Sequence, residues 1–158
     1  MSRRDARICF NHELKQIDLR IGQLRQLLRE NGINLDDSDR SIQELNDWFV
    51  SNMQSSELYP DRLENYGYAI VTDIAMYIGN QLIIRSDHKL RWSLNIGGKK
   101  GFSYQRRVIT GFSNGNYPNY EMDIDQTIAI YGVWAITINE RKQDNEFLEL
   151  IESALSKV

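Results

Sequence analysis

The sequence is poor in the features that mark secreted and membrane proteins. Cys9 is the only cysteine among 158 residues, so no internal disulfide can form. No apolar run is long enough to cross a bilayer, and the basic residues near the N-terminus are not followed by the apolar stretch of a secretory signal. These absences predict a protein of the reducing cytoplasm that does not enter a membrane.

Recognisable catalytic, metal and phosphate motifs are also missing. No serine lies in a Gly-x-Ser-x-Gly pattern, and Gly97–Gly101 lacks the spacing of a phosphate-binding loop. The Asp-x-Asp pairs at 37–39 and 123–125 each precede an expected helix, where capping explains a carboxylate better than metal binding does. The sequence therefore predicts no metal, no cofactor and no catalytic residue. The alternative is an enzyme whose site lies near Asp87 and His88.

What the chain does contain is typical of one globular domain. Its residues are 41% hydrophobic and 26% charged, and a chain of 158 residues can bury one core. The sequence has no internal repeat and no low-complexity linker. We therefore expect a single compact domain over residues 1–158.

Apolar residues at intervals of three and four predict helices in the N-terminal half. The first helix is expected over residues 5–31, with Gly22 marking a close helix crossing. The second begins at Ser38 or at Ser41, because Ser41 and Glu44 fit a capping box.

A third helix is expected from about Asp61 to Arg85, with Pro60 at its first-turn position. Its broad apolar face should make it the most buried helix. Alternation over Leu90–Ile96 and Phe102–Phe112 then predicts an antiparallel β-hairpin around a turn at Gly97–Gly101. We expect this hairpin to pack on the third helix.

The C-terminal third begins with an ambiguous segment. Over residues 124–138 the apolar spacing slightly favours a helix capped by Asp123 or Asp125, although the same residues are rich in strand formers. Residues 144–156 have the clear pattern of an amphipathic helix. The predicted fold class is therefore α+β, with N-terminal helices, a central antiparallel β-hairpin and C-terminal helices.

The net charge of −3 hides two segments of opposite sign. Residues 34–64 carry eight acidic and two basic side chains, whereas residues 85–107 carry seven basic and one acidic. Charge separated in this way can steer a partner of opposite sign. The first candidate partner-binding set, the acidic ridge, comprises Asp36, Asp37, Asp39, Glu44 and Asp47. The second, the basic hairpin, comprises Arg85, Lys89, Arg91, Lys99, Lys100, Arg106 and Arg107.

Each set also has a plainer interpretation. Several acids of the ridge lie at the start of a helix, whose dipole stabilises them there. The basic hairpin carries Trp92, Phe102 and Tyr104, and cations beside aromatic rings suit single-stranded nucleic acid. Strand alternation can equally turn the rings into the core and the cations to water. The acidic overall balance favours a protein partner over nucleic acid.

Three stretches of the chain form a further pattern. Ser41–Phe49 matches a Ser-apolar-x-x-Leu-x-x-Trp helix, Asp73–Gly79 matches a helix ending in Tyr-apolar-Gly, and Trp92 follows in a strand. Together they resemble a family of small, poorly characterised bacterial cytoplasmic proteins. Asn80 stands where that family tends to place glutamate. The resemblance implies a protein that is not an enzyme, in a class where some small bacterial proteins are immunity partners that block a toxin.

The leading prediction is therefore a non-enzymatic protein-binding module, such as a bacterial immunity or regulatory protein. An acidic ridge would suit a basic toxin such as a nuclease. The first alternative is nucleic-acid binding through the basic hairpin, and the second is the enzyme site near Asp87 and His88.

Overall fold

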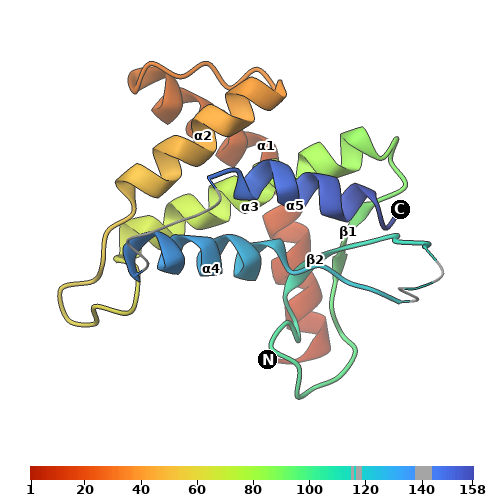
Figure 1. The fold of residues 1–158 in the computed structure, drawn as a ribbon. Coiled ribbons are helices and arrows are strands. Elements are labelled where there is room, and N and C mark those ends of the chain that lie inside the picture. Colours follow the sequence, from red (N-terminus) through yellow and green to blue (C-terminus); the bar gives the residue numbers. More distant parts are fainter. Residues whose placement is uncertain (115, 117–118, 138–143) are drawn as a thin grey trace.

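The computed structural model describes residues 1–114, 116, 119–137 and 144–158. These residues form five helices and one two-stranded antiparallel sheet, so the chain is α+β (Figure 1). Three helices precede the hairpin in the sequence and two follow it. None of the helices in this part of the chain is both long and apolar enough to cross a membrane. The elements are α1 Arg3–Glu30, α2 Asp39–Asn52, α3 Asn65–Arg85, β1 Arg91–Leu94, β2 Arg107–Thr110, α4 Ile124–Thr137 and α5 Glu146–Leu155.

Helix α3 forms the centre of the molecule. It packs most extensively against α4 and α1, and α5 also lies against it (Figure 1). Ile74, Ile78 and Leu82 are completely buried. Apolar residues occupy most sides of this helix, which is the pattern of a helix enclosed by others. The expectation that the third helix is the most buried one is confirmed.

Helix α2 is capped by Ser38, and the capping box expected at Ser41 is wrong. The Ser41 backbone N–H donates to Ser38 Oγ at 3.1 Å, so Ser38 precedes the first turn. Ser41 is buried within that turn, and its hydroxyl donates to the Ser38 carbonyl at 2.9 Å. Glu44 does not reach back to a cap amide but pairs with Arg40 at 3.2 Å.

Helix α3 begins at Asn65, so the expectation that Pro60 opens it is wrong. The preceding residues form a loop that is closed by a β-bridge between Ser55 and Leu63. Leu63 is buried, and its Cβ lies 3.3 Å from the position that a Cβ on Gly67 would take. Leu63 therefore bridges to Ser55 through its backbone while its side chain packs against the first turn of α3.

The hairpin is shorter than expected. Residues 95–106 form a long loop between β1 and β2, and Phe102 is 89% exposed, so the strand predicted to start at Phe102 is wrong over its first part. The turn expected at Gly97–Gly101 is present, because the Gly101 N–H donates to the Gly98 carbonyl at 2.8 Å. Two further turns replace the start of the strand: the Tyr104 N–H donates to the Gly101 carbonyl at 3.1 Å, and the Arg106 N–H donates to the Ser103 carbonyl at 3.0 Å.

The sheet packs on α3 through Trp92, as expected. Trp92 lies opposite Ile109 in the hairpin register, and its Nε1 donates to Asn80 Oδ1 at 3.1 Å. The indole ring covers Gly79 so closely that a Cβ there would lie 2.1 Å from two ring carbons. By contrast, apart from its chain neighbours and the backbone of its own helix, no atom of another described residue lies within 4 Å of a Cβ position on Gly22, so the close helix crossing expected there is wrong.

The ambiguous C-terminal segment forms the helix α4. Asp123 caps it, because the Gln126 N–H donates to Asp123 Oδ1 at 2.9 Å. Ile124 and Ile128 are completely buried where α4 packs on α3 and α2. Packing on neighbouring helices thus overrides the strand propensity of this segment. Position 138, the last of the expected helix, lies outside the described residues.

Candidate functional site

Two of the five acids of the acidic ridge, Asp37 and Asp39, are paired with arginines from other elements. Asp37 Oδ1 accepts hydrogen bonds from Arg25 Nη2 and from the Tyr77 hydroxyl, each at 3.0 Å. Asp39 Oδ1 accepts one from Arg85 Nη1 at 2.8 Å. Arg85 belongs to the set predicted as the basic hairpin, but its side chain points toward the acidic ridge. These pairs reduce the negative charge that this part of the ridge offers to a partner.

The other three acids of the ridge remain available. Among the described residues neither Asp36 nor Asp47 forms an ion pair. Hydrogen bonds from the Ser38 side chain and backbone hold the pKa of Asp36 below its ordinary value, so this carboxylate stays charged at neutral pH. Glu44 pairs with Arg40, whose side chain is 90% exposed. Such an exposed pair is weak and can be exchanged for a partner's cation.

Beside these acids the surface is hollowed by a shallow cavity of about 490 Å³, which we name the α2 groove. Ile33 and Trp48 supply its apolar surface, and both are half-buried. Glu44 and Asp47 stand at its acidic edge. A neighbouring cavity of about 320 Å³ shares Glu44 with the groove and reaches Asp36. The full lining of the α2 groove is Gly32, Ile33, Glu44, Asp47, Trp48, Ser51 and Asn52.

The basic hairpin does not hold its cations together. Arg85 pairs with the acidic ridge, and Arg106 and Arg107 turn toward a cavity between helices. Of the three aromatic residues of this segment, only Phe102 is exposed. The hairpin therefore lacks a row of exposed rings beside its cations. The remaining members are exposed side chains without an ion pair to any described residue: Lys89, Arg91, Lys99 and Lys100.

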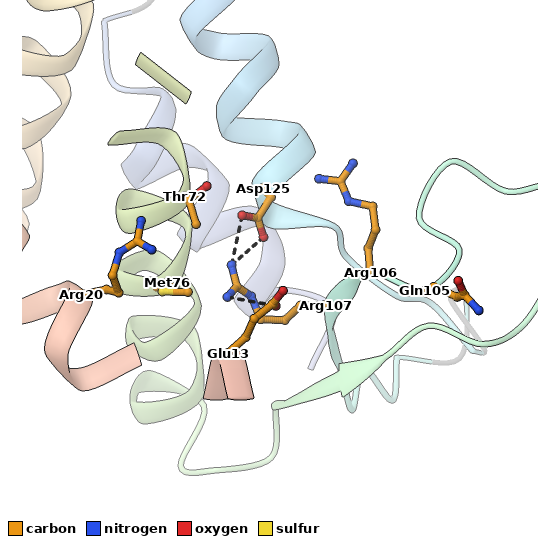
Figure 2. A pocket seen from close by; sticks show the side chains of 8 residues that line it. All are labelled: Glu13, Arg20, Thr72, Met76, Gln105, Arg106, Arg107 and Asp125. Carbon is orange, nitrogen blue, oxygen red and sulfur yellow. Dashed lines mark hydrogen bonds and ion pairs between the residues drawn. The ribbon is translucent and has the colours of Figure 1, made fainter. Parts of the chain in front are cut away.

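Arg106 and Arg107 face a cavity of about 290 Å³ that we name the arginine pocket (Figure 2). It lies between α1, α3, the start of β2 and the start of α4. Figure 2 shows Arg107 between Glu13 and Asp125, with Arg20 and Arg106 on either side in this view. The lining residues are Glu13, Arg20, Thr72, Met76, Gln105, Arg106, Arg107 and Asp125.

Arg107 is the buried arginine of the arginine pocket, with 6% of its surface exposed. Its Nη2 donates to both carboxylate oxygens of Asp125, at 2.8 and 3.0 Å, and its guanidinium lies 4.9 Å from the Trp92 ring centre. Its Nη1 is 3.7 Å from Glu13 Oε2, too far for a hydrogen bond. Its Nε is buried without an acceptor among the described residues. Burial raises the pKa of Asp125, and the Arg107 charge opposes that rise.

Arg20 and Arg106 each contact a carboxylate at the Nε side of the guanidinium group. Arg20 Nε donates to Asp73 Oδ1 at 2.6 Å, and Arg106 Nε lies 3.3 Å from Asp123 Oδ2. Burial raises the pKa of Asp73, and the adjacent Arg20 charge counteracts it. No described residue accepts a hydrogen bond from the terminal amino groups of either arginine. Arg20 is not among the residues predicted from the sequence, although it lies three residues after Ile17, at the spacing of the apolar residues of this helix.

The enzyme alternative places its site at Asp87 and His88. Asp87 and His88 lie in the turn after α3 with φ angles of 53° and 59°, and both side chains are exposed. Neither residue lines the arginine pocket, the α2 groove or the cavity beside the groove. In the part of the chain that the structure describes, no three histidine, cysteine or acidic side chains are placed to hold a metal ion.

Comparisons with protein-family models, curated proteins and solved structures give no match to this chain. The resemblance of Ser41–Phe49 and Asp73–Gly79 to small bacterial proteins therefore stays a prediction. The structure gives several of its positions a packing role, since Ser41 and Leu45 are buried. Asn80 accepts a hydrogen bond from Trp92, which a glutamate at this position could also do.

Proposed function

We propose that the protein is a non-enzymatic module that binds a basic protein through the α2 groove and the adjoining acidic ridge. The observation that carries this proposal is the composition of the groove, where half-buried Ile33 and Trp48 are bordered by Glu44 and Asp47. An apolar centre with a polar rim is characteristic of protein interfaces. Tryptophan is also enriched among the residues that contribute most to binding energy.

The charge of the groove's surroundings supports a basic partner. Asp36 and Asp47 form no ion pair with a described residue, and the partner of Glu44 is the exposed Arg40. Carboxylates that no internal cation neutralises attract a cationic surface from a distance and accelerate its association. A toxin blocked by an immunity protein is one partner of this kind, and the target of a regulatory protein is another.

The test is affinity purification from the native cells with three forms of the protein, followed by quantitative mass spectrometry. The ridge variant carries Asp36→Asn, Glu44→Gln and Asp47→Asn. The matched control carries Asp18→Asn, Glu57→Gln and Glu152→Gln, which remove the same charge at exposed positions away from the groove. We expect wild type and control to retain a basic protein that the ridge variant loses. For the purified pair, the ridge changes should weaken binding at least about tenfold.

Two further measurements complete this test: the salt dependence of partner binding and the binding of nucleic acid. Because the partner is steered by charge, its association should slow as ionic strength rises. Equal retention of the partner by the ridge variant and by wild type would contradict the proposed interface. Salt-sensitive binding of labelled single-stranded RNA or DNA, with no protein retained, would instead favour the basic hairpin.

A further inference from the structure

Three arginines reach one small cavity from parts of the chain far apart in sequence. Arg20 comes from α1, Arg106 from the end of the hairpin loop and Arg107 from β2. Two carboxylates, those of Glu13 and Asp125, lie in the cavity lining with the three arginines, and Asp73 and Asp123 lie behind Arg20 and Arg106. The carboxylates that hold Arg20 and Arg106 do not line the cavity.

Arg20 and Arg106, which lie on either side of Arg107 in Figure 2, have terminal amino groups that are free to bind an oxyanion. Asp73 and Asp123 each engage the Nε side of one guanidinium, at 2.6 and 3.3 Å. No described residue accepts a hydrogen bond from the terminal amino groups of Arg20 or Arg106. Paired N–H groups on a guanidinium edge match two oxygens of a phosphate or carboxylate. Because the ion pairs already restrict these side chains, a ligand that binds them loses less conformational entropy.

The buried Arg107 adds a charge that the fold does not fully satisfy. Its Nη2 is bound to Asp125, but its Nη1 has no hydrogen bond and its Nε is buried without an acceptor among the described residues. Buried charged donors are normally satisfied, because an unsatisfied one costs stability. Glu13 is about half exposed and lies 3.7 Å from Nη1, so it can swing aside and leave Nη1 to another oxyanion.

From these observations we propose that the arginine pocket binds the oxyanion group, phosphate or carboxylate, of a small ligand. This site shares no residue with the α2 groove, so it goes beyond the proposed protein contact. Thr72, Gln105 and Met76 complete the lining, in which Met76 is the one apolar side chain among polar and charged ones, so it suits a hydrated, charged ligand better than an apolar one.

The test titrates the protein with inorganic phosphate, phenyl phosphate and benzoate at constant ionic strength, by calorimetry and by amide chemical shifts. Arg106→Gln removes one cation of the pocket and leaves the buried Arg107 pair in place. Arg40→Gln removes the same charge from an exposed site on α2 and serves as the control. We expect saturable binding to wild type that Arg106→Gln weakens about tenfold, the loss of one charge-assisted hydrogen bond, and that Arg40→Gln leaves unchanged.

The probes also separate the two sources of an oxyanion. Tighter binding of phenyl phosphate identifies a phosphate ligand, and tighter binding of benzoate identifies a carboxylate ligand. Arg106→Gln should not alter retention of the basic protein, so failure at one site leaves the other proposal standing. The inference is overturned if none of the probes saturates the protein in the millimolar range, or if Arg40→Gln weakens binding as much as Arg106→Gln does.

Discussion

At Gly79 the packing leaves no room for a side chain. A Cβ would lie 2.1 Å from two carbons of the Trp92 ring, a distance at which the ring must move. The ring cannot move freely, because its Nε1 is bonded to Asn80 and Arg107 lies against its face. We predict that Gly79→Ala destabilises the protein by about 1–3 kcal/mol, the usual cost of overpacking. Urea unfolding followed by tryptophan fluorescence measures the effect.

Gly22 provides the matched control for this prediction. It also lies inside a helix, but no neighbouring atom is within 4 Å of its Cβ position. Gly22→Ala should therefore stabilise the protein by about 0.5–1 kcal/mol, because glycine pays a larger conformational entropy cost in a helix than alanine. If Gly79→Ala were as stable as Gly22→Ala, the indole would not lie over Gly79.

Individual residues also show why only part of the arginine pocket could be predicted. The basic segment drew attention to Arg106 and Arg107, because a run of cations is visible in sequence. Their partners could not be identified, since Glu13 and Asp125 lie 94 and 18 positions from Arg107 and meet it only in the folded chain. Residues that pair from distant segments have no characteristic spacing in the sequence by which the pair could be recognised. For the same reason the sequence showed Arg85 as a hairpin cation rather than a partner of the acidic ridge.

At the scale of elements, the predictions that rested on helical periodicity were the accurate ones. The apolar spacing of residues 5–31 and 144–156 places α1 and α5 to within a few residues. The errors lie where tertiary contacts select between local alternatives. Leu63 bridges to Ser55 and packs against the first turn of α3, which starts after Pro60, and turns at Gly101 and Ser103 replace the start of the second strand.

The start of α5 depends on a side chain from another helix. Its own cap residue, Asn145, makes no side-chain hydrogen bond to the helix. Asn46 of α2, which is 1% exposed, donates to the Asp144 carbonyl at 2.7 Å and accepts from the Phe147 N–H at 3.1 Å. Asn46→Ala leaves that buried N–H without an acceptor, so we predict a loss of about 2 kcal/mol in the free energy of unfolding.

Gln43 is the control for Asn46. Its Nε2 donates to the same Asp144 carbonyl at 2.6 Å, but the contact is exposed and water can replace it. Gln43→Ala should therefore change stability by less than about 0.5 kcal/mol in urea unfolding. Hydrogen exchange should show faster opening of the first turn of α5 in Asn46→Ala alone. Equal losses in both variants would mean that α5 does not depend on the buried amide.

Across the whole molecule, folding brings the two charged segments into contact. Arg85 from the basic segment pairs with Asp39 from the acidic one, and Arg25 of α1 pairs with Asp37. The separation of charge along the sequence is therefore larger than its separation on the surface. Within the acidic ridge, the acids without an ion pair to a described residue or with only an exposed one are Asp36, Asp47 and Glu44, which line the α2 groove or the cavity beside it. A partner that recognises charge would meet a smaller acidic surface than the composition of residues 34–64 suggests.

All five helices and β2 contribute buried residues to one hydrophobic cluster, with α3 at its centre. A core shared in this way cannot lose one element without exposing apolar surface on the others, so we predict a single cooperative unfolding transition. Three tryptophans allow a stringent test, because Trp48 lies on α2, Trp92 on β1 and Trp134 on α4. Variants that each retain one tryptophan, with the others changed to phenylalanine, should give fluorescence transitions that coincide with the loss of helical circular dichroism. An earlier transition at Trp92 would show that the hairpin unfolds separately. In that case the arginine pocket would open while the helices remain folded, and a ligand bound there should move the Trp92 transition alone.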